Sequence, residues 1–185
     1  DKFPKSELEA LGYKCAVNGQ KSWNGVAIIS KHEIEDIKLG LDDNTQDEQA
    51  RYIEATIKNI RVASIYLPNG NPVDSEKFPY KLEWMDRLYN HAKELLDLNI
   101  PIILGGDFNI IPEEKDAWDI SKWRDDALYK IESRKKFRSI LNLGYTDAFR
   151  INNTQSGQYS FWDYQAGAWQ KNNGIRIDHF LTSPL

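Results

Sequence analysis

The apolar run at residues 100–104 constrains the fold of this 185-residue sequence more than any other feature. An almost uninterrupted run of aliphatic residues is typical of a strand that is buried on both faces of its sheet. Such a strand needs a covering layer on each side, which indicates a layered domain. The run follows an amphipathic pattern at residues 77–98 that predicts a helix, because apolar residues recur there at steps of three and four. These residues are Phe78, Leu82, Met85, Leu88, Ala92 and Leu95.

Shorter runs of apolar residues predict the other elements. Strands are expected at residues 25–30, 52–57, 61–67, 159–162 and 175–181. The first three of these runs are rich in β-branched residues and are bounded by Gly, Asn or Asp. A second helix is expected at residues 133–142. Because strands and helices follow one another in a mixed order, the sequence predicts a single domain of the α/β or α+β class over residues 1–185.

The composition is that of a folded protein. Hydrophobic residues make up 41% of the sequence, which is enough for a substantial core. The charged fraction is 28% and no low-complexity tract is present, which argues against a disordered chain. No run approaches 18 apolar residues, so we expect no membrane span. Cys15 is the only cysteine, which fits a reducing compartment, and we expect a cytoplasmic protein.

The charge distribution is uneven. The net charge is −4. A protein that coats nucleic acid without sequence preference should be basic, because neutralisation of the phosphates drives its binding. Residues 121–138 are the exception, with seven basic and three acidic side chains. A solvated helix face and a local anion-binding surface both account for this segment, and the sequence leaves the two open.

The segment at residues 105–109, Gly-Gly-Asp-Phe-Asn, directly follows the buried strand and carries the strongest chemical signal. Glycines let the backbone turn sharply and allow a ligand to approach closely. Asp107 and Asn109 are two residues apart, so their side chains are expected to project on the same side. A carboxylate can bind a hard cation or accept a proton from water. The plainer alternative is a turn in which both side chains satisfy local backbone groups.

Two other segments place polar residues at strand ends. Tyr66 ends a predicted strand and precedes a Pro-Asn-Gly turn, so its hydroxyl and the amide of Asn69 can each donate to a phosphate. Arg176 and Asp178 alternate with isoleucines and are expected to share one strand face. There, Asp178 would be a buried carboxylate able to orient a histidine. His179 would point to the opposite face, and we expect it to be structural or exposed.

Aromatic residues cluster at residues 159–164, followed by Trp169. Core packing is the default explanation for such a cluster. The stretch at residues 167–174 is rich in Gly and Asn, however, which indicates a loop. Aromatic side chains exposed on this loop would be able to face a base or a sugar.

These motifs occur in the order and spacing of one known family. The sequence resembles the exonuclease III family of the endonuclease/exonuclease/phosphatase superfamily. The matching segments are residues 23–27, 66–70, 106–109, 144–150, 159–162 and 176–178. The resemblance implies a four-layer sandwich of two packed mixed β-sheets flanked by helices. It also implies a DNA repair enzyme that depends on Mg²⁺ or Mn²⁺ and hydrolyses double-stranded DNA, 5′ to abasic sites and at 3′ ends.

The resemblance also implies roles for individual residues. Asp107 would position or deprotonate the attacking water, and Asn109 would bind the scissile phosphate. Both would belong to the metal site. Tyr66 and Asn69 would contact the same phosphate, and Asp178 would hold a catalytic histidine.

Four further residues would bind the substrate outside the reacting centre. Phe161, with Trp162 beside it, would line the pocket that takes an abasic sugar. Trp23 and Arg51 would lie on the rim that faces DNA.

The resemblance further implies that some family features lie outside this sequence. The main metal ligand, a glutamate at the end of the family's second strand, is expected before Asp1. A strand and the catalytic histidine are expected after Leu185. We therefore expect an incomplete domain that is inactive alone and that self-associates through exposed strand edges. The complete protein is expected to be a monomer.

Two alternatives stay open. Within the superfamily, the chain could be a phosphatase acting on inositol lipids, or a sphingomyelinase. In a different functional class, it could be a non-catalytic fragment that retains a DNA-binding surface.

Overall fold

The computed structural model describes residues 3–41 and 46–184. Its main sheet has six strands in the spatial order β3–β4–β5–β6–β10–β7. Their bounds are Glu35–Leu39, Tyr52–Ile57, Ile60–Tyr66, Ile102–Asp107, Asp178–Thr182 and Thr146–Asp147, in the same spatial order. The sheet is mixed, because β5 and β6 are parallel while the other neighbouring pairs are antiparallel.

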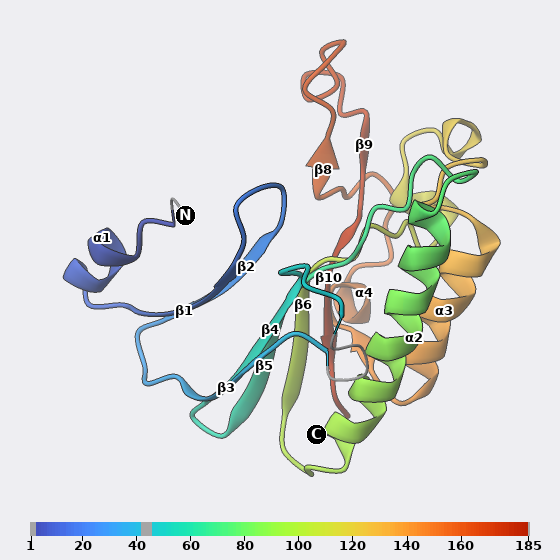
Figure 1. The fold of residues 1–185 in the computed structure, drawn as a ribbon. Coiled ribbons are helices and arrows are strands. Elements are labelled where there is room, and N and C mark those ends of the chain that lie inside the picture. The colour runs from blue at the N-terminus through green and yellow to red at the C-terminus, as the bar shows by residue number, and fades with distance from the viewer. Residues whose placement is uncertain (1–2, 42–45, 185) are drawn as a thin grey trace.

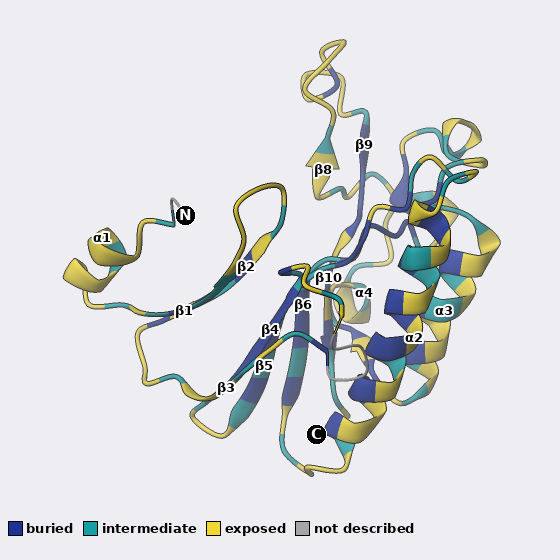
Figure 2. Ribbon diagram, viewed as in Figure 1, coloured by how far each residue is buried: buried dark blue, intermediate teal, exposed yellow. Residues whose placement is uncertain are grey.

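Helices α2 (Lys77–Leu96) and α3 (Ile131–Asn142) cover one face of this sheet (Figure 1). Their inward faces are buried against the strands, as Figure 2 shows. The predicted central strand is β6, which begins at Ile102, two residues later than expected, and lies between β5 and β10. The largest cluster of buried side chains fills the space between the sheet and the two helices.

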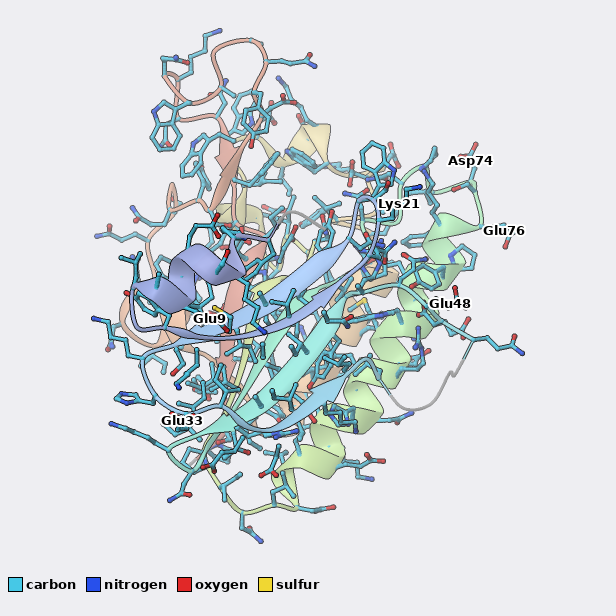
Figure 3. The ribbon with its side chains drawn as sticks, turned by 60° about the vertical axis from the view of Figure 1, so that its left-hand side comes forward. Glu9, Lys21, Glu33, Glu48, Asp74 and Glu76 are labelled. Carbon is cyan, nitrogen blue, oxygen red and sulfur yellow. The ribbon has the colours of Figure 1, made fainter. Side chains whose placement is uncertain are left out.

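A hairpin of β1 (Lys14–Gly19) and β2 (Gly25–Ser30) packs on the opposite face, with α1 (Lys5–Ala10) outside it. In Figure 3 the hairpin lies in front of the main sheet, and Lys21 marks its turn. Helices, sheet, hairpin and α1 form the four expected layers, so the predicted α/β architecture is confirmed. The second sheet is this antiparallel hairpin within the described residues, and not the mixed sheet that we expected.

The remaining elements are short. They are η1 (Glu114–Asp116), η2 (Ile120–Lys122), α4 (Ala148–Asn152), β8 (Phe161–Trp162) and β9 (Gly174–Ile175). Strands β8 and β9 project beyond the upper end of the main sheet (Figure 1). The single strand expected at residues 175–181 is divided into β9 and β10. Arg176 and Ile177 leave the ladder there because their backbone groups bond to Asp116 and Phe108.

Helix α2 buries a face that differs slightly from the predicted one. Met85, Leu88 and Ala92 are buried as expected, but Leu82 is only half-buried and the charged Lys81 lies inside. The helix also ends at Leu96, two residues earlier than expected. Within residues 3–41 and 46–184, no helix has the length and apolar character needed to cross a bilayer.

A buried ionic cluster joins β4 to α2 on the helix-covered side of the sheet. The carboxylate of Glu54, which is 1% exposed, accepts hydrogen bonds from three side chains. Arg61 Nη2 donates at 2.8 Å, the Tyr52 hydroxyl at 2.5 Å, and His91 Nε2 lies at 2.9 Å. Burial by itself would raise the pKa of Glu54, but these hydrogen bonds outweigh it and lower the pKa from 4.5 to about 2.

The Glu54 cluster should therefore make the fold sensitive to acid. A carboxyl whose pKa is lowered on folding stabilises the native state above its unfolded pKa, and that stabilisation is lost as the pH falls toward the folded pKa. We expect the parent protein to be more stable than Glu54→Gln at pH 5. The gap in unfolding free energy should shrink by on the order of 2 kcal/mol by pH 2.

Urea denaturation of both proteins at fixed pH values measures this gap. Because Glu54→Gln cannot titrate at this position, it is the matched control for all other acid-induced changes. A gap that stays constant between pH 5 and pH 2 would show that Glu54 does not carry the effect.

Candidate active site

Four polar residues form a row across the upper end of the main sheet. Tyr66 on β5 is paired with Asp107 on β6, and Asp107 is paired with Asp178 on β10. Arg51 precedes β4 and continues the row, because its carbonyl accepts the Tyr66 N–H at 2.8 Å. Paired residues on adjacent strands point to the same face of a sheet. We refer to these four residues as the polar row.

The polar row lies on the face that the hairpin covers and the helices do not. Ile65, Leu104 and Leu181 pack into the helix-side core, and strand residues alternate between the two faces. On the same three strands, Tyr66, Asp107 and Asp178 are separated from these core residues by one or three positions. Their side chains therefore point to the opposite face of the sheet, the face that the hairpin covers. Tyr66 accordingly packs beside the core of the hairpin.

Glycine makes the close pairing of β5 and β6 possible at the row. Gly106 has a φ of +139°, a conformation that residues with a Cβ rarely adopt. A Cβ added there would lie 2.1 Å from the carbonyl oxygen of Ile65 on β5. Gly105 and Gly106 thus lie within β6 and not in the sharp turn that we expected after it, and Gly106 permits the strand pairing that places Asp107 next to Tyr66.

Asn109 joins the two loops that follow β5 and β6. Its N–H donates to Asp107 Oδ1 at 2.8 Å, and its Nδ2 donates to the carbonyl oxygen of Leu67 at 2.8 Å. Its Oδ1 accepts from Asn69 Nδ2 at 3.2 Å. Asn109 is buried and has a φ of +48°, whereas Asn69 is exposed. The structure thus brings together Asp107, Asn109, Asn69 and Tyr66, as the sequence predicted.

Burial is the main reason that the pKa of Asp107 rises from 3.8 to about 6. The nearby Asp178 carboxylate acts in the same direction. The N–H of Asn109 and the cations Lys81 and Arg51 act against it. A carboxyl group with a pKa near neutrality is suited to accept a proton from a bound water.

The predicted shared face of Arg176 and Asp178 is wrong. Asp178 is exposed, while Arg176 turns inward to Asp116 at 2.7 Å and Asp147 at 2.8 Å. The reason is the gap between β9 and β10, which breaks the strand alternation on which the prediction rested. His179 is buried, bonds to Arg176 at 2.9 Å and faces away from the polar row, so its predicted structural role fits.

The residues predicted for the rim, Trp23 and Arg51, and for the sugar pocket, Phe161 and Trp162, lie in different places. Arg51 belongs to the polar row: its guanidinium lies 5.0 Å from the centre of the Tyr66 ring and donates to the Tyr66 carbonyl at 3.2 Å. Trp23, in the hairpin turn, is 95% exposed. Phe161 and Trp162 lie in the projecting β8, where Trp162 packs on Trp169 with ring centres 4.6 Å apart.

Lys81 is a site residue that sequence reasoning missed. Its side chain is fully buried, and its Nζ donates to the backbone carbonyls of Asn69 at 3.0 Å and Asn109 at 2.6 Å. Gly70 makes room for it, since a Cβ there would lie 2.6 Å from Cδ of Lys81. Burial lowers the pKa of Lys81 to about 7. The signal in the sequence was a lysine three residues after Phe78, on the apolar face of the helix.

Lys81→Met should destabilise the protein by about 2–4 kcal/mol. Methionine fits a similar volume but removes the donor to the buried carbonyl of Asn109 and to the part-buried carbonyl of Asn69, and losing the partner of a buried group costs roughly 1–3 kcal/mol. Lys77→Met is the matched control, because Lys77 is exposed one turn earlier on the same helix. That control should change stability by less than about 0.5 kcal/mol. Urea denaturation of the two variants tests this, and equal stability would contradict the role of Lys81.

The oxygen atoms at the polar row fit a hard divalent cation. Asp107 and Asp178 present carboxylates from paired strand positions, while Asn109 turns its Nδ2 toward Asp107 and its Oδ1 toward Asn69. Mg²⁺ and Mn²⁺ prefer such oxygen ligands, and Mg²⁺ keeps several waters when few protein ligands are present. No group of three or more His, Cys, Asp or Glu side chains suited to a metal occurs in the described part of the chain. Asp107 and Asp178 are the two carboxylates that paired positions of the main sheet offer to a cation at this end.

The family model of the Endonuclease/Exonuclease/phosphatase family matches residues 3–185. The chain belongs to this family. An exodeoxyribonuclease III from Haemophilus influenzae is 31% identical over 193 residues, covering 98% of this chain and 72% of the relative. The resemblance to the exonuclease III family is thereby confirmed.

Solved structures agree with this placement in the endonuclease/exonuclease/phosphatase family. The 3′ phosphatase NExo from Neisseria, bound to a product DNA hairpin, superposes with a TM-score of 0.96 at 37% identity. An AP endonuclease from Archaeoglobus fulgidus gives a TM-score of 0.91 at 36% identity. Each comparison covers 99% of this chain and 71% of the other. The chain spans 65%, 72% and 46% of the lengths of three curated relatives.

Proposed function

We propose that this family member is a DNA repair nuclease that hydrolyses phosphodiester bonds 5′ to abasic sites and at 3′ ends. The observation that carries the proposal is the polar row. It places Tyr66, Asp107 and Asp178 on adjacent strands in one register, with Asn69 and Asn109 tied to them. The relatives add support, since they include an exodeoxyribonuclease III, an AP endonuclease and a 3′ phosphatase bound to DNA.

The side chains around the polar row have complementary roles in this proposal. The hydroxyl of Tyr66 and the amide of Asn69 donate to the non-bridging oxygens of the scissile phosphate, where negative charge develops. Asp107 accepts a proton from the attacking water. Asn109 holds Asp107 in place through its backbone N–H. Asp178, exposed beside Asp107, orients the histidine that the family uses.

Asp107 and Asn109 are the residues that we propose bind Mg²⁺ or Mn²⁺. When bound, the cation stabilises negative charge on the phosphate during hydrolysis. Arg51 supports the same end of the site, because it holds the ring and the carbonyl of Tyr66. An exposed Trp23 in the hairpin turn completes the proposed DNA-facing surface.

The test uses the native protein that contains these 185 residues. We would incubate it with a duplex that has one abasic site, a duplex with a recessed 3′ end, and a phosphoinositide. Each reaction is run with Mg²⁺, Mn²⁺ or EDTA. We expect a cut 5′ to the abasic site and shortening from the 3′ end, both abolished by EDTA. Release of phosphate from the lipid with intact DNA would favour the phosphatase alternative. Binding of DNA without any cleavage would favour a non-catalytic protein.

A further inference from the structure

A pocket lies on the helix-covered side of the main sheet, apart from the polar row. It has a volume of about 230 Å³ and is formed mainly by α3, α4 and the segment that follows β6. Asp147, one of its lining residues, is paired with Leu181 of the helix-side core, so both side chains share the face opposite to the polar row. We call it the arginine pocket after four residues that line it: Arg134, Arg138, Arg150 and Arg176.

Ion pairs hold the two more buried arginines of the arginine pocket. Arg176 is 4% exposed and donates to Asp116 at 2.7 Å and to Asp147 at 2.8 Å. Arg150 also pairs with Asp116, so two carboxylates balance these two cations. Two buried atoms still lack a partner within the described part of the chain, the donor Arg150 Nε and the acceptor Asp147 Oδ1. Such atoms are rare in folded proteins, and they commonly mark the place of a bound water or ion.

The other two arginines carry charge that no carboxylate balances. Arg134 and Arg138 are four residues apart on α3, so they lie on the same face of the helix. Arg134 donates its Nε to the carbonyl of Pro112 at 3.1 Å, which holds it at the pocket. Neither arginine forms an ion pair among the residues that the structure describes, and Glu113, the nearby carboxylate, is paired with Lys115 at 3.0 Å. Like charges at this spacing repel each other, so an anion between the two guanidinium groups would be stabilising.

We propose that the arginine pocket binds the phosphoryl group of free phosphate or of a small phosphate monoester, between Arg134 and Arg138. Guanidinium groups bind phosphate through paired N–H donors, and a phosphoryl group carries about 1.5 to 2 negative charges at neutral pH. That charge matches two unbalanced arginines better than the single charge of a carboxylate or a sulfate ester. In its singly protonated form, the phosphoryl group also offers the hydroxyl donor that Asp147 Oδ1 lacks.

The size of the arginine pocket limits the rest of the ligand. Its volume of about 230 Å³ is below the roughly 300–1,000 Å³ of sites that enclose drug-sized molecules. Phe137 and Leu141 add an apolar wall, so a phosphoryl group with a short apolar substituent fits. Arg134 and Arg138 belong to the basic segment at residues 121–138, and such a ligand makes that segment a local anion-binding surface. Binding here does not depend on the proposed nuclease function.

Isothermal titration calorimetry on the native protein in EDTA tests the arginine pocket with three probes: inorganic phosphate, phenyl phosphate and phenyl sulfate. We expect saturable binding of both phosphates and about tenfold weaker binding of phenyl sulfate, which has a similar shape but a single charge. Arg138→Gln should weaken binding of phenyl phosphate about tenfold, as is typical for the loss of one hydrogen bond to a charged group. Lys135→Gln is the matched control, because Lys135 is an exposed cation on the same helix and does not line the pocket. Circular dichroism checks that both variants are folded.

The outcomes distinguish the arginine pocket from the other places where a phosphate could bind. Tyr66→Phe, at the polar row, should leave the affinity for phenyl phosphate unchanged. A loss in that variant with none in Arg138→Gln would overturn the assignment, as would the absence of saturable binding of both phosphates. If Arg138→Gln weakened binding of duplex DNA more than Lys135→Gln does, the pocket would be a contact for the DNA backbone, and the assignment would again fail. Tighter binding of phenyl phosphate than of phosphate supports an ester as the ligand, and the reverse supports the free ion.

Discussion

Asp107→Asn should lower the rate of DNA cleavage by roughly 10²–10⁴-fold, the range typical for removing a general base. The amide is nearly the same size as the carboxylate but cannot accept a proton from water at neutral pH. Its oxygen can still accept the N–H of Asn109, which the native carboxylate binds at 2.8 Å. The fold should therefore persist, and the loss should appear in kcat measured on a duplex with one abasic site.

Asp97→Asn is the matched control for this substitution. Asp97 is exposed just after the end of α2, far from the polar row along the sheet. Its variant should cleave DNA at the parental rate. If Asp107→Asn retained more than about a tenth of the parental rate while folded, Asp107 would be neither the base nor an essential cation ligand.

Gly106→Ala should destabilise the protein by more than about 4 kcal/mol, which is exceptional for one methyl group. The new Cβ would lie 2.1 Å from the carbonyl oxygen of Ile65 and 2.8 Å from its nitrogen. Both are backbone atoms of β5, so β5 and β6 would have to separate at the point where they pair. Thermal unfolding followed by circular dichroism measures the effect, and loss of the folded state is an equally clear result.

Substitutions at two other glycines are controls that distinguish the effect of this collision from the effect of backbone strain. Gly157 has a φ of +78° with open space around it, so Gly157→Ala reports the strain alone, about 1–2 kcal/mol. A Cβ at Gly105 would meet the Ala63 carbonyl oxygen at an ordinary contact distance of 3.8 Å and would collide with the ring of Phe180, which is 62% exposed and can move aside. We expect both controls to fold. If Gly106→Ala were no less stable than Gly157→Ala, the close approach of β5 and β6 would not be essential.

Periodicity predicted the buried elements well and the exposed ones poorly. The strand expected at residues 52–57 coincides with β4, and the expected helix with α2 to within two residues, because both bury a regular set of apolar side chains. The edge strand β3 was not predicted. Most of its residues are exposed, so it lacks the alternation of apolar and polar residues that indicates a strand.

The site residues that were predicted lie in local sequence motifs, and those that were missed or misplaced depend on contacts that are distant in the sequence. Asp107, Asn109, Tyr66 and Asn69 lie in local motifs at strand ends, and strand pairing then brings them together. Lys81 was missed because its acceptors are backbone carbonyls in two loops that are distant in the sequence. Every residue has a backbone carbonyl, so no residue type in the sequence marks these acceptors. The orientation of Arg176 could not be predicted either, since it depends on Asp116 and Asp147, which are 60 and 29 residues away.

The pairing of Tyr66, Asp107 and Asp178 has a consequence for how such a sequence can change. A strand that gains or loses a single residue turns every following side chain to the opposite face. An insertion within β6 would thus exchange Asp107 for a neighbour and expose core residues at the same time. Segments beyond the sheet, such as residues 163–173, carry no such constraint. Changes of length can accumulate there while the spacing within β5, β6 and β10 stays fixed.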